Sequence, residues 1–98
     1  MEIEFDDPDL DRLETDRDFT AGFTPAIVKG FRKVLRFLRA AADERDLVAM
    51  HGLNFHPLEG SRKGQHAVNL NDQYRLIIQI RGEGRNKRLG VKEIVDYH

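Results

Sequence analysis

The segment YRLIIQI, residues 74–80, indicates a β-strand and places a sheet at the centre of the predicted fold. Its larger apolar side chains recur at every second position: Tyr74, Leu76, Ile78 and Ile80. Side chains two residues apart point to the same face of a strand, so this face is expected to lie in the core. Arg75, Ile77 and Gln79 fall on the other face. The period of two continues through the C-terminal half, whereas a helical period dominates before Gly52.

Three further strands are expected in the C-terminal half, at residues 53–58, 66–70 and 89–97. Pro57 lacks an amide proton, which makes the first of them an edge or irregular strand. Turn residues separate the strands at 60–64, 71–72 and 82–87. Connections this short favour antiparallel pairing. One face of the last strand is expected to carry Leu89, Val91, Glu93, Val95 and Tyr97.

The N-terminal half is predicted to be mainly helical. Thr24 and Pro25 mark a helix start, with threonine as the N-cap and proline at the first helical position. Apolar residues then recur at helical spacing from Ile27 to Ala42. The other elements expected here are a short strand at residues 2–5, a helix starting at residues 6–8 and a short helix at residues 42–50.

Helices followed by strands with short turns predict an α+β fold, with helices packed on one face of a largely antiparallel sheet. The 98 residues suffice for a single domain spanning residues 1–98. The expected core members are Phe31, Val34, Leu38, Leu76, Ile78 and Val95.

Composition narrows the classes of protein. The absence of cysteine from the sequence excludes a disulfide framework and thiolate metal sites. The apolar runs are far shorter than the roughly 18–20 residues of a membrane span. The start MEIEFDDPD is acidic, whereas a signal peptide starts with basic residues. We therefore expect a cytoplasmic protein that does not enter a membrane.

The net charge of −1 hides an asymmetry along the chain. Residues 1–28 carry nine acids and two bases, whereas residues 29–98 carry fourteen bases and eight acids. This distribution suggests a polyanion-binding surface that the acidic leader partly screens, or else two independently solvated stretches. The long helix carries a basic stripe, which either contacts RNA or is a solvated face. Its residues are Lys29, Arg32, Lys33, Arg36 and Arg39.

Familiar catalytic and cofactor motifs are missing from the sequence. The segment 82–84 has two glycines but lacks the third glycine of a dinucleotide site. The four histidines lack the spacing of a metal site, and Ser61, the only serine, has no nucleophile elbow around it. We therefore expect neither a metal nor a cofactor.

The strand half carries polar groups suited to cutting RNA. Such chemistry needs a base for the 2′-OH proton, cations for the charge on the phosphate and an acid for the leaving 5′-oxygen. Histidine transfers protons near neutral pH, and arginine binds phosphate through two donors. A single histidine on a strand is, however, more often a structural residue. The candidates are His56, Arg62, Lys63, Arg75, Asp96, Tyr97 and His98.

Four sequence blocks of this half resemble the HigB branch of the RelE-like toxins, the killer proteins of plasmid-maintenance toxin–antitoxin modules. The blocks are FHPLEG (55–60), RKGQ (62–65), NDQYR (71–75) and EIVDYH (93–98). Their order and spacing are similar to the family's, and the likeness covers roughly residues 25–98.

The resemblance implies a small RelE-like domain whose N-terminal helices pack on a curved, mainly antiparallel sheet. It also implies an mRNA interferase, a ribosome-dependent endonuclease that cuts mRNA in the A site by 2′-OH attack, without a metal or cofactor. The implied partners are the ribosome, mRNA and a HigA-like helix-turn-helix antitoxin. Operator DNA would be contacted only through that antitoxin.

The motif match implies the catalytic residues His56, Arg75, Asp96, Tyr97 and His98. Arg75 would neutralise the scissile phosphate, Tyr97 would position a base, and Asp96 would orient an imidazole or accept the 2′-OH proton. The two histidines would divide the acid and base duties, in an order that the sequence leaves open. Arg62 and Lys63 would bind RNA.

Three positions depart from the family pattern: Glu59 replaces a usual lysine, Asn69 a common arginine and Tyr74 the usual tryptophan. Fewer cations and one added anion weaken polyanion binding. The alternative function is therefore a catalytically weak toxin homologue that acts as an antitoxin-binding module in transcriptional autoregulation. A third reading is an unrelated α+β domain whose basic helix docks on an acidic protein.

Overall fold

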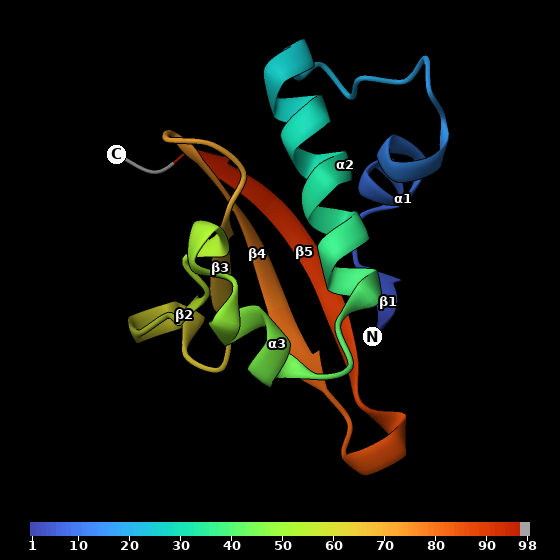
Figure 1. The fold of residues 1–98 in the computed structure, drawn as a ribbon. Helices are drawn as coiled ribbons and strands as arrows, with labels where there is room; N and C mark the ends of the chain where they lie inside the picture. Colours follow the sequence, from blue (N-terminus) through green and yellow to red (C-terminus); the bar gives the residue numbers. More distant parts are fainter. Residues whose placement is uncertain (97–98) are drawn as a thin grey trace.

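A computed structural model describes residues 1–96, which form three α-helices and one five-stranded sheet in the order β1-β5-β4-β3-β2 (Figure 1). The strands are β1 (Glu2–Phe5), β2 (His56–Pro57), β3 (His66–Asn69), β4 (Tyr74–Arg81) and β5 (Arg88–Asp96). The helices are α1 (Pro8–Thr15), α2 (Pro25–Ala40) and α3 (Glu44–Ala49), with single 3₁₀ turns η1 (His51–Leu53), η2 (Gly60–Arg62) and η3 (Gly84–Asn86). The predicted α+β class is confirmed.

The sheet is antiparallel except at one edge. Strands β2, β3, β4 and β5 pair antiparallel in that order, whereas β1 runs parallel to β5. β2 is only two residues long, shorter than the strand expected at residues 53–58. Leu53 belongs to η1, and Pro57 has no amide proton with which to extend the ladder.

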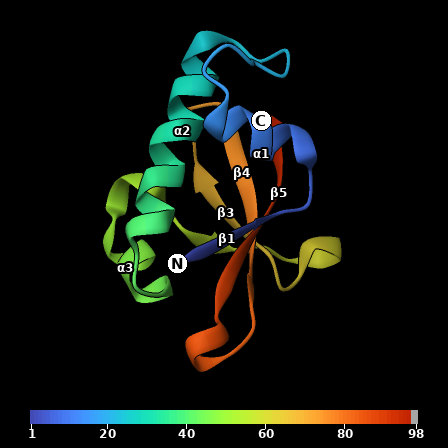
Figure 2. The same cartoon turned by 90° about the vertical axis from the view of Figure 1, so that its right-hand side faces the viewer.

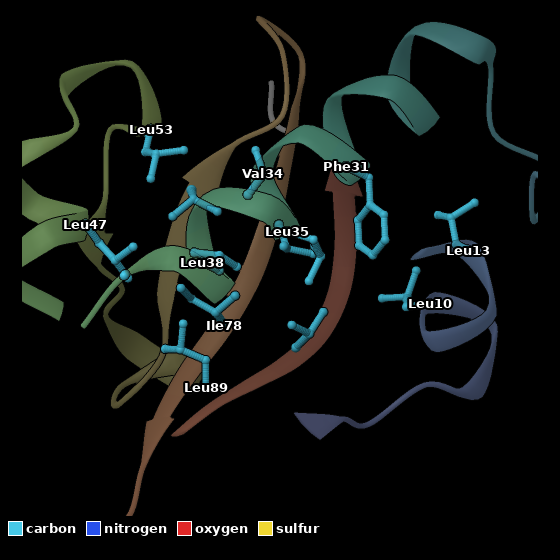
Figure 3. Close-up of a cluster of buried hydrophobic side chains, with 14 of the residues drawn as sticks. Leu10, Leu13, Phe31, Val34, Leu35, Leu38, Leu47, Leu53, Ile78 and Leu89 are labelled. Carbon is cyan, nitrogen blue, oxygen red and sulfur yellow. The ribbon is translucent and has the colours of Figure 1, made fainter. Parts of the chain in front are cut away.

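α2 covers one face of the sheet. It starts after Thr24 as predicted, and its core-facing residues are buried: Ile27, Val28, Phe31, Val34, Leu35 and Leu38. Figure 3 shows Phe31, Val34, Leu35 and Leu38 directed at β4 and β5, with Leu10 and Leu13 of α1 beside Phe31. Five of the six predicted core residues are therefore confirmed. No helix within residues 1–96 is long and apolar enough to cross a membrane.

The prediction that Val95 belongs to the core is wrong. β4 and β5 contain a bulge: Ile78 pairs with Val91, but Ile77 pairs with Glu93, so Lys92 is an extra residue on β5. An extra residue moves all later side chains of the strand to the opposite face. Leu89 and Val91 are buried in the core, but beyond Lys92 it is Ile94 that packs against the core, not Val95.

Candidate functional site

The sheet has a second face, which α2 does not cover and which is called here the helix-free face. Figure 2 shows α2 and α3 on one side of the strands and the segment around η2 on the other. Residues paired across strands share a face, so the register assigns two rows of side chains to this face. The first row is His56, Ala67, Ile77 and Glu93. The second row is Asn69, Arg75 and Val95.

Two predicted site residues, His56 and Arg75, therefore lie on one face although 18 sequence positions separate them. They are two strands apart and offset by two residues along the strands. With strands about 4.8 Å apart and a rise of about 3.4 Å per residue, their Cα atoms are about 12 Å apart. Over that distance, the side chains of His56 and Arg75 can contact one phosphodiester linkage from opposite sides.

The ring of His56 is oriented by a local contact. Its Nδ1 lies 2.6 Å from the carbonyl oxygen of Asn54. Asn54 has a left-handed backbone with φ of 49°, a conformation that asparagine tolerates better than most residues. In the neutral ring Nδ1–H donates to this carbonyl, so Nε2 carries the free lone pair. His56 is thereby arranged to accept a proton at Nε2.

Arg75 is held by the turn that precedes it. The Asn71 side-chain oxygen accepts hydrogen bonds from the amides of Gln73 and Tyr74, at 2.9 and 2.7 Å. The Arg75 Nη1 donates to the carbonyls of Asn71 and Tyr74, at 2.9 and 3.2 Å. The block NDQYR is therefore one structural unit that positions a half-buried guanidinium at the edge of the helix-free face.

Arg62 reaches over the same face from η2. Its Nη2 donates to Glu93 Oε1 at 2.8 Å, and its Nη1 donates to Gln65 Oε1 at 3.1 Å. This bridge from η2 to β5 spans the positions of Ala67 and Ile77, which are 0% and 2% exposed. Glu93 is not among the predicted site residues, because an unbroken alternation along β5 predicts that its side chain faces the core with Leu89 and Val91.

The remaining predicted site residues lie around these groups. Lys63 is exposed beside Arg62. Asp96 pairs with Tyr74 at the end of β5 and accepts a hydrogen bond from Gln73 Nε2 at 3.2 Å. Tyr97 and His98 lie outside the described residues. Within residues 1–96 no group of three or more His, Asp or Glu side chains is arranged to hold a metal ion.

The acidic leader neutralises cations at the far end of this face. Arg81 binds Glu4 at 3.1 Å and Asp6 at 2.8 Å, Lys92 binds Asp6 at 3.1 Å, and Arg88 binds Glu4. Hydrogen bonds from Arg81 and then Lys92 lower the pKa of Asp6 to about 2. Gly90 lies beneath this network, because a Cβ there would fall 2.2 Å from Arg81 Cζ.

His66 is structural. Its ring stacks on Phe55 with centroids 4.6 Å apart and planes 5° apart. Burial, and after it the nearby His56, lowers the pKa of His66 from the ordinary value of 6.5, while Glu44 opposes this shift. Folding therefore favours the neutral ring.

We expect the stability contributed by His66 to be present above pH 6.5 and to decrease as the pH falls below it, because the unfolded state then binds more protons. Urea unfolding at about pH 7 and about pH 5.5 checks this expectation. His66→Gln should lose less stability on acidification than the wild type, whereas the control His51→Gln, on exposed η1, should behave like the wild type. Equal losses in all three proteins would contradict the assignment.

Comparisons with known proteins identify the family and agree with the fold. A family model described as the RelE-like toxin of type II toxin–antitoxin system HigB matches residues 3–98. The chain is 40% identical over 81 residues to Toxin HigB-1 of Vibrio cholerae serotype O1, covering 81% of this chain and 83% of that protein. A YoeB/ParE toxin from Agrobacterium tumefaciens has a similar structure, with a TM-score of 0.61, 16% identity and full coverage of both chains. YafQ from E. coli follows with a TM-score of 0.59 and 15% identity, covering 97% of this chain and 91% of that one.

Proposed function

The chain belongs to the HigB-like, RelE-fold toxins of type II toxin–antitoxin systems, and we propose that it inhibits translation by cutting mRNA in the ribosomal A site. The observation that carries this proposal is the convergence of His56, Arg62 and Arg75 on one helix-free face of the sheet. The RNA strand is proposed to lie along this face between the half-buried His56 and Arg75, outside the buried Ala67 and Ile77, while the opposite face is filled by the core.

The proposed reaction is an in-line attack that needs no metal. His56 Nε2 takes the proton of the 2′-OH, and the 2′-oxygen then bonds to phosphorus as the bond to the 5′-oxygen breaks. The departing 5′-oxygen receives a proton from the acid, for which we propose His98, and a 2′,3′-cyclic phosphate remains. Arg75 stabilises the extra negative charge on the phosphate. Asp96 and Tyr97 are proposed to orient the acid and a base.

Arg62 and Lys63 are proposed to bind the flanking phosphates. Arg62 already shares its charge with Glu93, so an incoming phosphate competes with a carboxylate for it. This competition weakens RNA binding relative to an unopposed arginine.

As a toxin of a type II system, the protein has an antitoxin partner. We propose that this partner is a HigA-like helix-turn-helix protein, that operator DNA is contacted only through it, and that the toxin acts in the cytoplasm. The alternative function is an antitoxin-binding module with little cleavage. The Arg62–Glu93 ion pair and the acidic Glu59 favour that alternative.

Induction of the gene, followed by primer extension on cellular mRNA, tests the proposed function. We expect growth arrest and cuts within codons, and in a purified system the cuts should require ribosomes. Arg75→Gln should cut more slowly, whereas Arg85→Gln, an exposed arginine of η3, is the matched control. Antitoxin binding without growth arrest or cuts would establish the alternative.

A further inference from the structure

We propose that a concavity between the loop after α1 and helix α2 binds the phosphodiester backbone of structured RNA, at a site separate from the helix-free face. Four of the seven residues that line it are cations: Arg17, Lys29, Arg32 and Arg36. None of its lining residues is a carboxylate.

Arg32 builds this concavity. Its Nε donates to the carbonyl of Leu13 at 2.9 Å, and its Nη2 donates to the carbonyl of Asp16 at 2.8 Å, with longer contacts to the next carbonyls of the loop. These bonds fix the loop against α2 and bring Arg17 beside Lys29. Because carbonyls rather than carboxylates accept these bonds, the charge of Arg32 adds to the positive potential of the site.

Neighbouring cations of the same region are neutralised, but those of the concavity are not. Arg39 forms a two-point ion pair with Glu14, at 2.6 and 2.7 Å, and Arg12 pairs with Asp16 at 3.1 Å. Within residues 1–96, the side chains of Arg17, Lys29 and Arg36 form no ion pair. Fixed like charges without a counter-ion attract a polyanion.

The chemistry of the concavity favours a phosphate backbone over a protein partner. The centres of protein interfaces are enriched in aromatic residues, Met and Arg and are otherwise depleted of charged residues. Arginine suits both kinds of site, but no aromatic residue or Met lines the concavity, whereas Phe37 and Met50 line a separate cavity of about 310 Å³ on the helix side. The concavity offers point charges instead, and Lys29 and Arg36 are about 10 Å apart along the helix. Two cations at that spacing can contact different phosphates of one strand.

The residues that line the concavity belong to α2 and the loop after α1, and none of them lies in the two rows of the helix-free face, so both sites can be occupied together. If the protein acts on ribosomes, as proposed above, the structured RNA held here is ribosomal RNA. The contact would orient the toxin while mRNA lies across the sheet. The binding site itself does not depend on that choice of RNA.

A pair of charge-matched variants tests the site. Lys29→Gln/Arg36→Gln removes two cations of the concavity, and Arg45→Gln/Arg85→Gln removes two exposed cations elsewhere. The probe is an RNA duplex of about 16 base pairs, titrated from about 50 to 200 mM KCl. We expect the concavity variant to bind about tenfold more weakly and to reduce the slope of log K against log [salt] by one to two. The control should keep the slope of the wild type.

With ribosomes, the concavity variant should raise KM for cleavage and leave kcat unchanged. Duplex binding equal to that of the control would overturn the proposal. Loss of antitoxin binding with unchanged duplex binding would also overturn it, because the concavity would then be a protein interface. A different result is that the wild type cuts no mRNA while duplex binding is still reduced only in the concavity variant. That result would support this RNA-binding site and would refute only the proposed function.

Discussion

His56→Ala is expected to lower the rate of mRNA cleavage on the ribosome by about 10²–10⁴-fold, the usual loss when an acid–base group is removed. The hydrogen bond from Nδ1 to the Asn54 carbonyl leaves Nε2 as the proton acceptor, and alanine offers no replacement. The measurement is single-turnover cleavage of a defined mRNA on programmed ribosomes. Ribosome binding should stay within a few-fold of the wild type, because the charged residues proposed to contact RNA are unchanged.

His51→Ala is the matched control for this prediction. His51 lies on η1, only five residues away, is exposed, and belongs to neither row of the helix-free face. It should cut at the rate of the wild type. Equal activity of the two variants would mean that His56 takes no part in the reaction.

His98→Ala, which removes the proposed acid, should lower the rate of mRNA cleavage by a similar factor. If the two histidines serve one reaction step, their effects should not add, because a residue that has lost its counterpart has little left to contribute. The double variant should then be only slightly slower than either single variant. Additive losses would indicate that the two histidines act in separate steps.

Leu38→Ala is expected to destabilise the protein by about 2–5 kcal/mol. This loss combines the burial energy of the removed methyl and methylene groups with the cost of the cavity that they leave in the core. Leu38 is 0% exposed and lies in the core between α2 and the sheet (Figure 3). For a domain of this size such a loss lowers Tm by about 8–40 °C. Urea unfolding with a common m-value provides the measurement.

Val48→Ala is the matched control for core packing. Val48 is 63% exposed on α3, so its truncation should change stability by about 0.5 kcal/mol at most. A loss in Leu38→Ala as small as that in the control would contradict the described packing of α2 on the sheet.

Local patterns in the sequence determined the elements of this fold. The helical spacing after Pro25 and the alternation around Leu76 depend on residues that are neighbours in the chain, and both predictions are confirmed. The four blocks also identified the family, because their order along the chain is itself a property of the sequence. The roles of His56 and Arg75 stay predictions, although their shared face agrees with them.

Only the tertiary structure decided which face each residue of β5 occupies. The bulge at Lys92 follows from how β4 and β5 pair, and no pattern within β5 reveals it. The extra residue turns Val95 away from the core and directs Glu93 to the helix-free face, where it meets Arg62 from a segment 31 positions earlier. The tertiary structure also decided the role of Arg32. The helical pattern placed it on a basic stripe, but its guanidinium binds backbone carbonyls of α1 and the loop that follows. The spacing of apolar residues along the chain predicts helices and strands, because these depend on neighbouring residues. Strand register and long-range contacts depend instead on residues that folding brings together.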